Sequence, residues 1–254
     1  MNLYVGTSGY SYKEWKGNFY PKDLPDKEML RYYGTKLPAV EINNTFYRLP
    51  RETVLQSWAD QVPADFRFSV KASQKITHFK RLKDVIDETE YLLRTVRILG
   101  PRLGVILFQL PPNLKKDLPR LEQFLRLLPG DSRTAFEFRH ASWFEDDVFN
   151  LLRANGCAIC IADADDELEI PFVSTARWGY LRLRKPEYSR NDLRNWMKRI
   201  QSQEWENAFI FFKHEDEGTG PKLAAQFLRL ANGDQDQKKE MAVGKPKTPA
   251  KSSR

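Results

Sequence analysis

Cysteine is scarce in this 254-residue chain, and the two that it has, Cys157 and Cys160, exclude a scaffold held together by disulfides. Both lie in one apolar run that reads as a strand. Residues three apart in a strand point to opposite faces and lie about 10 Å apart, whereas a disulfide needs Cα atoms within about 7 Å. We therefore expect two buried thiols and no redox pair.

Long apolar runs are also missing. No segment approaches the roughly 20 residues that a membrane span needs, so we expect no membrane partner. The first six residues lack the basic and apolar regions of a secretory signal. Together with the scarce cysteine, these absences predict a protein of the reducing cytoplasm. Hydrophobic residues make up 41% and charged residues 30% of the chain, which excludes global disorder.

The net charge of +7 is distributed unevenly. Residues 234–254 hold six basic and three acidic residues, so this short segment contributes +3 of the excess. It has no apolar periodicity with which to pack. We expect a single barrel domain over residues 1–232 and a disordered basic tail over 233–254. Such a tail could contact nucleic acid, but a solvated chain end is the simpler interpretation.

Eight short apolar runs have the β-branched and aromatic character of strands. They cover residues 3–7, 39–43, 66–71, 104–109, 134–139, 157–163, 178–182 and 208–213. Helical periodicity lies between most of them. This alternation predicts an α/β fold, a (β/α)8 TIM-like barrel. The sixth helix should be short or missing, because residues 164–177 carry acidic residues and a proline. An open doubly wound sheet is the alternative.

Polar residues gather where these runs end. In a barrel, interior positions at the carboxyl ends of the strands face the mouth, where active sites lie. The expected mouth residues are Ser8, Glu41, Asn43, Lys71, Gln109, Glu137, Arg139, Asp163, Arg182 and Lys213. Buried charges are costly unless they are paired, so we favour a ligand site. Internal ion pairs such as Glu137–Arg139 and Glu41–Lys71 are the alternative.

Several motifs carry a family resemblance. Residues 40–50, with the sequence VEINNTFYRLP, resemble the hallmark of the YecE-like family of uncharacterised proteins. Segments 6–10, 68–72, 76–78, 109–112 and 137–143 are similar to that family in the same order. The resemblance spans about residues 1–232 and implies a TIM-barrel-like fold without an assigned activity. The chain departs from the family at Arg184-Lys185, where a His-Gly pair is usual, and at Lys213-His214, where asparagines are usual. The family's ligand geometry at the last two strands therefore does not carry over directly.

Acid–base chemistry is the first use that we expect for the two glutamates. Carboxylates whose environments separate their pKa values can divide the roles of acid and base. We expect Glu137 to be the general acid or base and Glu41 its partner, oriented by Asn43. Lys71 and Gln109 would stabilise developing negative charge. The alternative is that each glutamate only neutralises a neighbouring cation.

The cations of the mouth favour an anionic ligand. Arginine suits bidentate binding of carboxylate or phosphate, which is the role expected for Arg139 and Arg182. Gly218 and Gly220 begin the last helix, where barrels often bind phosphate, although ordinary capping also explains them. Substrate contacts are also expected from His78, Tyr47 and Trp143 in loops at the mouth. For Trp143, anchoring of its loop is the alternative.

The need for a cofactor stays open. His78, His140 and His214 follow strands and, with the carboxylates, could bind a divalent metal. Their spacing matches no tight metal motif, and the nearby arginines and lysines would repel a cation. We therefore assign no residue to a metal.

Three functions fit these features. The first is an enzyme that acts by acid–base chemistry on a small anionic substrate, bearing phosphate or carboxylate and possibly sugar-like, at the carboxyl-terminal mouth of the barrel. The second is a nucleic-acid-binding protein or a phosphodiester-cleaving barrel nuclease, suggested by the basic excess and by basic runs such as 75–83 and 182–190. The third is a non-catalytic barrel that binds a ligand. The sequence does not indicate an oligomeric state.

Overall fold

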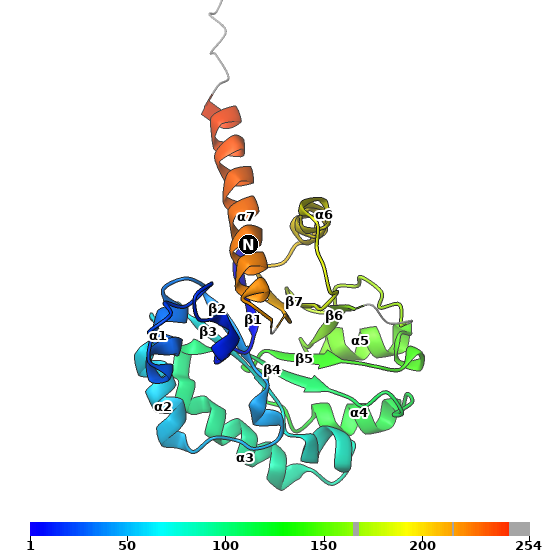
Figure 1. Cartoon of the computed structure of the whole chain (residues 1–254). Helices are drawn as coiled ribbons and strands as arrows, with labels where there is room; N and C mark the ends of the chain where they lie inside the picture. The colour runs from blue at the N-terminus through cyan, green and yellow to red at the C-terminus, as the bar shows by residue number, and fades with distance from the viewer. Residues whose placement is uncertain (165–167, 215, 244–254) are drawn as a thin grey trace, which may run out of the picture.

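The protein folds into a closed barrel of eight parallel strands, as a computed structural model shows (Figure 1). The structure describes residues 1–164, 168–214 and 216–243, without the side chains of residues 232 and 234–243. The strands are β1 (Asn2–Ser8), β2 (Ala39–Ile42), β3 (Arg67–Lys71), β4 (Leu103–Gln109), β5 (Thr134–Glu137), β6 (Ala158–Asp163), β7 (Trp178–Leu183) and β8 (Asn207–Phe212). They are hydrogen-bonded in sequence order, and β8 pairs with β1. The predicted barrel is confirmed, and the open sheet is excluded.

The helices form the outer layer of the molecule. They are α1 (Met29–Gly34), α2 (Glu52–Gln61), α3 (Ile86–Val96), α4 (Leu118–Leu125), α5 (Asp146–Ala154), α6 (Arg190–Gln201) and α7 (Thr219–Val243). Local chemistry sets several of their first residues. Ser189 and Asp192 form a capping box at the start of α6, and Asp117 caps α4 by accepting from the backbone N–H of Arg120.

The connection from β6 to β7 departs from the strand–helix alternation, as predicted. Its described residues, 164 and 168–177, contain no helix. Thr175 holds this segment against β6, because its hydroxyl accepts from the backbone N–H of Ile159 and donates to the carbonyl of Cys157. Helix α6 contacts the end of β6 instead, where Trp196 donates from Nε1 to the carboxylate of Asp163.

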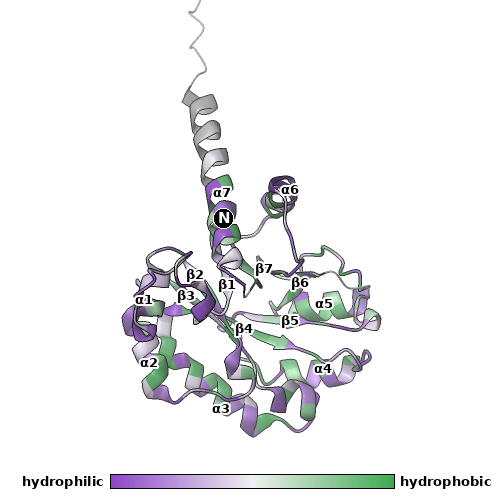
Figure 2. Cartoon of the chain, viewed as in Figure 1, coloured by the Kyte–Doolittle hydropathy of each residue, from purple (hydrophilic) through white to green (hydrophobic). Residues whose placement is uncertain are grey.

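Alternating strand residues divide the core into two layers. One buried cluster lies inside the barrel and includes Leu107, Cys160, Tyr180 and Phe211. A larger cluster, which contains Cys157, joins the outward-facing strand residues to the helices. The two cysteines are free and buried and belong to different layers, as expected. In Figure 2 hydrophobic colour runs along β4 and β5, while hydrophilic colour dominates α6 on the outside.

The last helix passes through the domain boundary expected from the sequence. Helix α7 packs against β1 and then extends beyond the barrel as far as Val243 (Figure 1). The expected boundary between residues 232 and 233 therefore falls inside a helix. The remainder of the expected tail, residues 244–254, lies outside the described residues.

The helices were also compared with the length and hydrophobicity that a membrane span requires. Across the described ranges, none is both long and apolar enough to span a bilayer.

Candidate functional site

Arg182 on β7 joins two buried glutamates at the carboxyl-terminal mouth of the barrel. Its Nη1 lies 2.6 Å from Oε2 of Glu137 on β5, and its Nη2 lies 2.9 Å from Oε1 of Glu41 on β2. Both carboxylates are fully buried, and only 3% of the arginine side chain is exposed. Burying three charges is costly unless they pair in this way. The guanidinium is therefore part of the barrel's interior.

Glu41 is fully occupied by protein donors. Its Oε1 accepts from Ser8 Oγ at 2.6 Å and from Asn43 Nδ2 at 3.1 Å, in addition to Arg182. Its Oε2 accepts from the hydroxyl of Tyr180 at 2.7 Å. Ser8 and Asn43, expected as substrate contacts, therefore position this carboxylate. The Nδ2 of Asn43 is turned to Glu41, so its Oδ1 is left as a buried acceptor without a hydrogen bond in the described structure.

Glu137 is occupied on one oxygen only. Its Oε2 accepts from Gln109 Nε2 at 2.9 Å as well as from Arg182. Its Oε1 has Arg184 Nη2 at 3.4 Å and Arg139 Nε at 3.9 Å. Those are ion-pair distances, and no described protein group makes a hydrogen bond to this buried oxygen. The second oxygen of Glu137 is therefore available to a donor on a ligand.

Both glutamates are held in their ionised form. Burial alone raises the pKa of a carboxyl group, but the charge of Arg182 and several hydrogen bonds outweigh burial at Glu41 and lower its pKa. At Glu137, Arg182 and Arg184 outweigh burial and lower the pKa to about 2. A carboxylate with so low a pKa carries no proton near pH 7. The expected role of Glu137 as a general acid therefore lacks support in the free protein.

Lys71 at the end of β3 has the opposite character. Its Nζ lies 4.1 Å from the centre of the Phe46 ring, and no described hydrogen-bond acceptor or carboxylate pairs with it. Burial lowers the pKa of Lys71, and the charge of Arg182 lowers it further, to about 8. Glu137 and Glu41 act in the other direction but do not compensate. Lys71 therefore exists in both protonation states near neutral pH.

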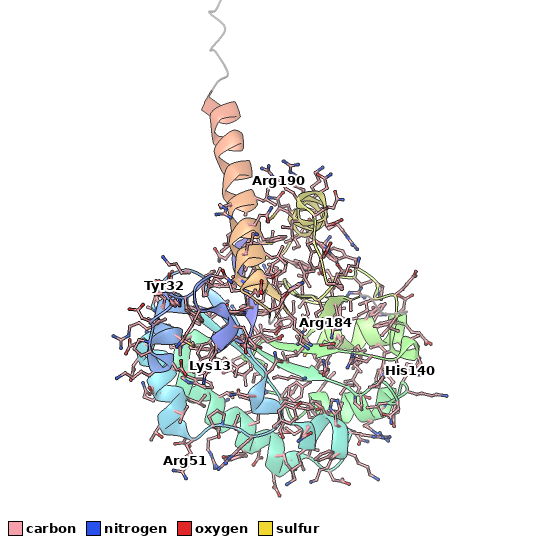
Figure 3. All side chains as sticks on the ribbon, viewed as in Figure 1. Lys13, Tyr32, Arg51, His140, Arg184 and Arg190 are labelled. Carbon is pink, nitrogen blue, oxygen red and sulfur yellow. The ribbon has the colours of Figure 1, made fainter. Side chains whose placement is uncertain are left out.

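Several further polar atoms at the mouth lack a partner in the described structure. They are Nε of Arg182, Nε of Arg184 and Oγ of Ser69, all buried. Figure 3 shows Arg184 within the outline of the molecule near β5, whereas Arg51 and Arg190 extend at its edge. A cavity of about 300 Å³ opens beside Asn43, between the loops that follow β1 and β2. Unsatisfied buried groups are rare in folded proteins, so such a cluster favours a ligand site.

The structure brings most of the residues expected at the mouth together. Glu41, Glu137, Arg182, Gln109, Ser8 and Asn43 form one hydrogen-bonded network, and Arg139 lies at ion-pair distance from it. Lys71 lies next to this network, close enough for its charges to shift the lysine pKa. The period-two alternation of the strands, read correctly from sequence, accounts for this convergence.

Asp163 does not join the network. Its carboxylate accepts from the hydroxyl of Tyr188 at 3.0 Å and from Trp196 Nε1 on α6 at 3.1 Å, and it pairs with Lys185. On β6 the inward positions include Cys160, so Asp163, three residues later, points to the helix layer. Its placement in the mouth was wrong, and the same alternation that placed Glu137 would have revealed this.

Three loop residues occupy different positions. Trp143 is buried, donates from Nε1 to the carbonyl of Leu114 at 2.7 Å and stacks on Phe138, so it anchors its loop and does not line the mouth. Tyr47 is 74% exposed. His78 packs edge-on against Phe46, and burial, together with Lys71 and other cations, lowers its pKa. Tyr47 and His78 therefore lie on the rim beside Lys71.

The residues expected near the last helix lie apart from the network. Gly218 lines a groove of about 700 Å³ between α1 and α7, beside Lys36 and Lys222. Gly220 packs so tightly that a Cβ atom there would lie 2.9 Å from the carbonyl oxygen of His214, so packing explains this glycine. Lys213 follows β8 with an exposed side chain.

No metal centre is formed by the described residues, which contain no cluster of three or more histidine, cysteine, aspartate or glutamate side chains arranged to hold an ion. His214 donates from Nε2 to the carbonyl of Lys185, and His140 pairs with Ser142, so these two histidines serve local contacts. The basic run 182–190 does not form one solvated face, because Arg182 is buried between the glutamates.

One member of the site was missed. Tyr180 donates to Glu41. It precedes Arg182 by two positions, so the strand alternation contained the signal, but an aromatic residue in a strand is usually a packing residue. Ser69, two positions before Lys71 on β3, is buried, as its inward-facing position in the alternation implies.

Comparisons with known proteins agree with this architecture. Residues 4–250 match the family described as "Protein of unknown function DUF72". The "UPF0759 protein YunF" of Bacillus subtilis is 24% identical, over 90% of this chain and 94% of its own length. The "UPF0759 protein YecE" of Escherichia coli K12 is 32% identical over 56% of this chain and half of its own length.

Solved structures show the same fold. The crystal structure of a DUF72 family protein from Thermotoga maritima superposes with a TM-score of 0.81 at 27% identity, covering 91% of this chain and all of that one. A second DUF72 structure, from Enterococcus faecalis, has a TM-score of 0.74 at 17% identity, covering 91% of this chain and 95% of that one. The resemblance to the YecE-like proteins is thus confirmed, and the chain belongs to the DUF72 family, whose function is not assigned.

Proposed function

We propose that this protein is an enzyme that acts on a small hydroxylated anion, such as a sugar phosphate or a sugar acid, at the carboxyl-terminal mouth of the barrel. One observation carries the proposal. The buried Oε1 of Glu137, which has no hydrogen bond in the described structure, lies beside cationic groups that are not fully neutralised.

The anionic part of such a ligand has cations to meet. Arg139 and Arg184 approach only the one free oxygen of Glu137, at 3.9 and 3.4 Å, and Arg184 keeps a buried Nε–H without an acceptor in the described structure. Lys71 adds a third positive charge beside them when it is protonated. Arginine binds phosphate and carboxylate with directed hydrogen bonds, and a lysine adds a point charge.

The hydroxyl groups of the ligand have acceptors to meet. Oε1 of Glu137 and Oδ1 of Asn43 are buried acceptors that lack donors among the described groups. A ligand hydroxyl donates to such an oxygen and removes the free-energy cost of leaving it unpaired. Cations and unfilled acceptors in one mouth together favour a ligand that is both anionic and hydroxylated.

Lys71 is the group best placed to move a proton. With a pKa of about 8, its neutral amine can accept a proton from the substrate and return it later in the reaction. Arg139 and Arg184 would stabilise the negative charge that develops on a substrate oxygen. In this arrangement Glu137 binds and orients a substrate hydroxyl. Glu41 holds Arg182 in place and does not act as a second acid.

Calorimetric titration with a panel of sugar phosphates and sugar acids, with the corresponding neutral sugars as comparison, tests this proposal. We expect the anions to bind and the neutral sugars not to bind measurably. Lys71→Met and Arg184→Met should each weaken binding by about tenfold or more, the usual scale for a charge-assisted contact. Lys198→Met, at an exposed position on α6, is the matched control. Equal binding of neutral sugars, or no effect of the mouth variants, would contradict the proposal.

Turnover and salt dependence separate the two alternative functions. A non-catalytic barrel would bind the anion but leave every ligand of the panel unchanged after long incubation. A nucleic-acid-binding protein or nuclease would bind DNA or RNA with an affinity that falls steeply with salt concentration. The buried position of Arg182 favours a small ligand, because this arginine cannot reach a phosphate backbone.

A further inference from the structure

We infer that Tyr47 and Phe79 form a stacking subsite on the rim of the mouth, which binds the planar ring of a nucleoside monophosphate while its phosphate meets the cations below. The inference deepens the proposed function and rests on it, because it names the class of hydroxylated anion. Tyr47 and Phe79 have 74% and 70% of their surfaces exposed, the highest values among the large hydrophobic side chains of the described structure.

Ring contacts link Tyr47 to Lys71, and Phe79 is the chain neighbour of a residue in the same group of contacts. The Phe46 ring lies under Nζ of Lys71, with its centre 4.1 Å from that atom. The Phe46 ring also contacts the ring of Tyr47, at 5.1 Å between centres, and the ring of His78, at 4.8 Å. Phe79 follows His78 directly. Tyr47 and Phe79 therefore belong to the loops that follow the neighbouring strands β2 and β3, and each is adjacent in sequence to one of the two residues of the Phe46–His78 ring contact.

The backbone holds Phe79 in its exposed position. Residues Lys75–Phe79 form a π-helical turn, a rare element that is frequent at functional sites. Three of the next five residues, Arg81, Leu82 and Asp84, have positive φ angles of 51°, 65° and 51°. Non-glycine residues rarely adopt this conformation, and strain of this kind gathers at ligand-binding sites.

That strained segment is anchored at several points. The Leu82 side chain is buried, and its backbone N–H donates to the carbonyl of Ile76 at 2.9 Å. Lys80 Nζ donates to the carbonyl of Asp84 at 2.7 Å and also pairs with Glu88. A loop fixed in this way keeps the Phe79 ring in solvent, although burial of an apolar ring would be more favourable. The exposure of Phe79 is thus a fixed feature of the rim.

The groups around Tyr47 and Phe79 favour a nucleoside monophosphate as the ligand. Exposed aromatic rings stack on other planar rings, and each of the nucleobases offers a planar face for such stacking. The cations Lys71, Arg139 and Arg184 supply the charge complementarity for one phosphate. The acceptors on Glu137 and Asn43 suit the hydroxyls of the ribose between base and phosphate. One ring subsite and one anion subsite match a single nucleotide better than a long strand.

Calorimetry with the full chain tests this inference. The ligands are ribose 5-phosphate and the four ribonucleoside monophosphates, which differ from it by the base. We expect at least one of the nucleotides to bind about tenfold more tightly than ribose 5-phosphate, the scale of one base–aromatic stack. The double variant Tyr47→Ala/Phe79→Ala should abolish this difference and leave ribose 5-phosphate binding unchanged. Tyr91→Ala, at a half-exposed aromatic on α3, is the control and should change neither affinity.

Each contrary result has a distinct meaning. If ribose 5-phosphate binds and no nucleotide binds more tightly, the stacking subsite is refuted while the proposed function stands. If none of the five ligands binds but other sugar acids do, the nucleotide assignment is again refuted. A single-stranded octanucleotide that binds more than tenfold more tightly than every mononucleotide, with a steep salt dependence, would overturn the assignment to a small ligand.

Discussion

Arg182 and Glu137 meet at 2.6 Å between Nη1 and Oε2, in a contact that joins strands β7 and β5 across the barrel mouth. Strands β5 and β7 are not neighbours in the sheet, so backbone pairing does not impose this contact. The same guanidinium reaches Glu41 on β2. One side chain thus ties three strands together at the end of the barrel where the candidate site lies, and the network serves the fold as well as the site.

Replacing Arg182 by methionine should strongly destabilise the protein. The change leaves Glu41 and Glu137 buried without their shared cation, and breaking a buried ion pair in this way typically costs about 3–5 kcal/mol. Urea unfolding followed by circular dichroism measures the loss. The matched control is Arg177→Met, which removes an exposed arginine paired with Glu206 and should change the unfolding free energy little. Similar losses for both variants would show that the buried network is not essential to stability.

Replacing Lys71 by methionine should raise the melting temperature at pH 7 while weakening anion binding by about tenfold or more. The folded pKa of Lys71, about 8, lies below its usual value of 10.5, so folding opposes protonation of this amine. An apolar side chain of similar length removes that cost. The bound anion, however, loses its contact with the positive charge of Lys71. Differential scanning calorimetry at pH 7 and pH 10 checks the expectation. The gain over the wild type should shrink at pH 10, where the folded wild type carries a neutral lysine. A lower melting temperature for the variant would argue that the ammonium stabilises the fold.

Stability in acid should report the low pKa of Glu137. Its folded pKa of about 2 lies below the usual 4.5, so its contribution is fully present above about pH 4.5 and is lost as the pH falls towards 2. At about 1.4 kcal/mol per pKa unit, the shift corresponds to roughly 3 kcal/mol. Glu137→Gln should therefore lose less stability than the wild type between pH 5 and pH 2. The urea midpoint of unfolding, measured against pH for the wild type and for the variant, tests this. The same pH dependence in both proteins would contradict the low pKa of Glu137.

The variant Glu137→Gln should also lower the pKa of Lys71. Glu137 raises the pKa of Lys71 against the effects of burial and Arg182, so removing its charge should move that pKa further below about 8. The chemical shift of the dimethylated, carbon-13-labelled lysine over a pH titration measures the change. Glu88→Gln, which removes a carboxylate paired with Lys75 and Lys80 outside the network, should leave the Lys71 titration unchanged. In the proposed enzyme, Glu137→Gln should also lower turnover, because the substrate hydroxyl loses the carboxylate that orients it.

Deleting residues 244–254 should leave the melting temperature nearly unchanged. The segment is rich in lysine and proline, and its only hydrophobic residue is Ala250, so it has little with which to contribute to a core. Calorimetry of the full chain and the shortened one, in the same buffer, compares the two. A fall of many degrees would show that the segment docks on the barrel and would contradict the expectation of a solvated tail.

Much of the fold followed from local patterns in the sequence. Short apolar runs alternating with amphipathic segments specify parallel strands covered by helices, because each element must bury its apolar side against the next. The period of two in a strand is equally local, so Glu137 and Lys71 could be placed in the mouth from their own neighbours. Asp163 obeys the same rule. It was assigned to the mouth because it ends β6, although its place in the inward–outward alternation points it to the helix layer.

The tertiary structure alone decided how these residues use their charges. Whether Glu137 is an acid or a permanently ionised carboxylate depends on Arg182, which lies 45 residues away in sequence and 2.6 Å away in space. That no carboxylate of the described residues pairs with Lys71 depends in the same way on which side chains come within reach. Electrostatic interactions vary with separation and with burial, and both quantities arise only when the barrel closes. The residues at the mouth are therefore a property of the sequence, whereas their pKa values and the acceptors left for a ligand are properties of the closed barrel.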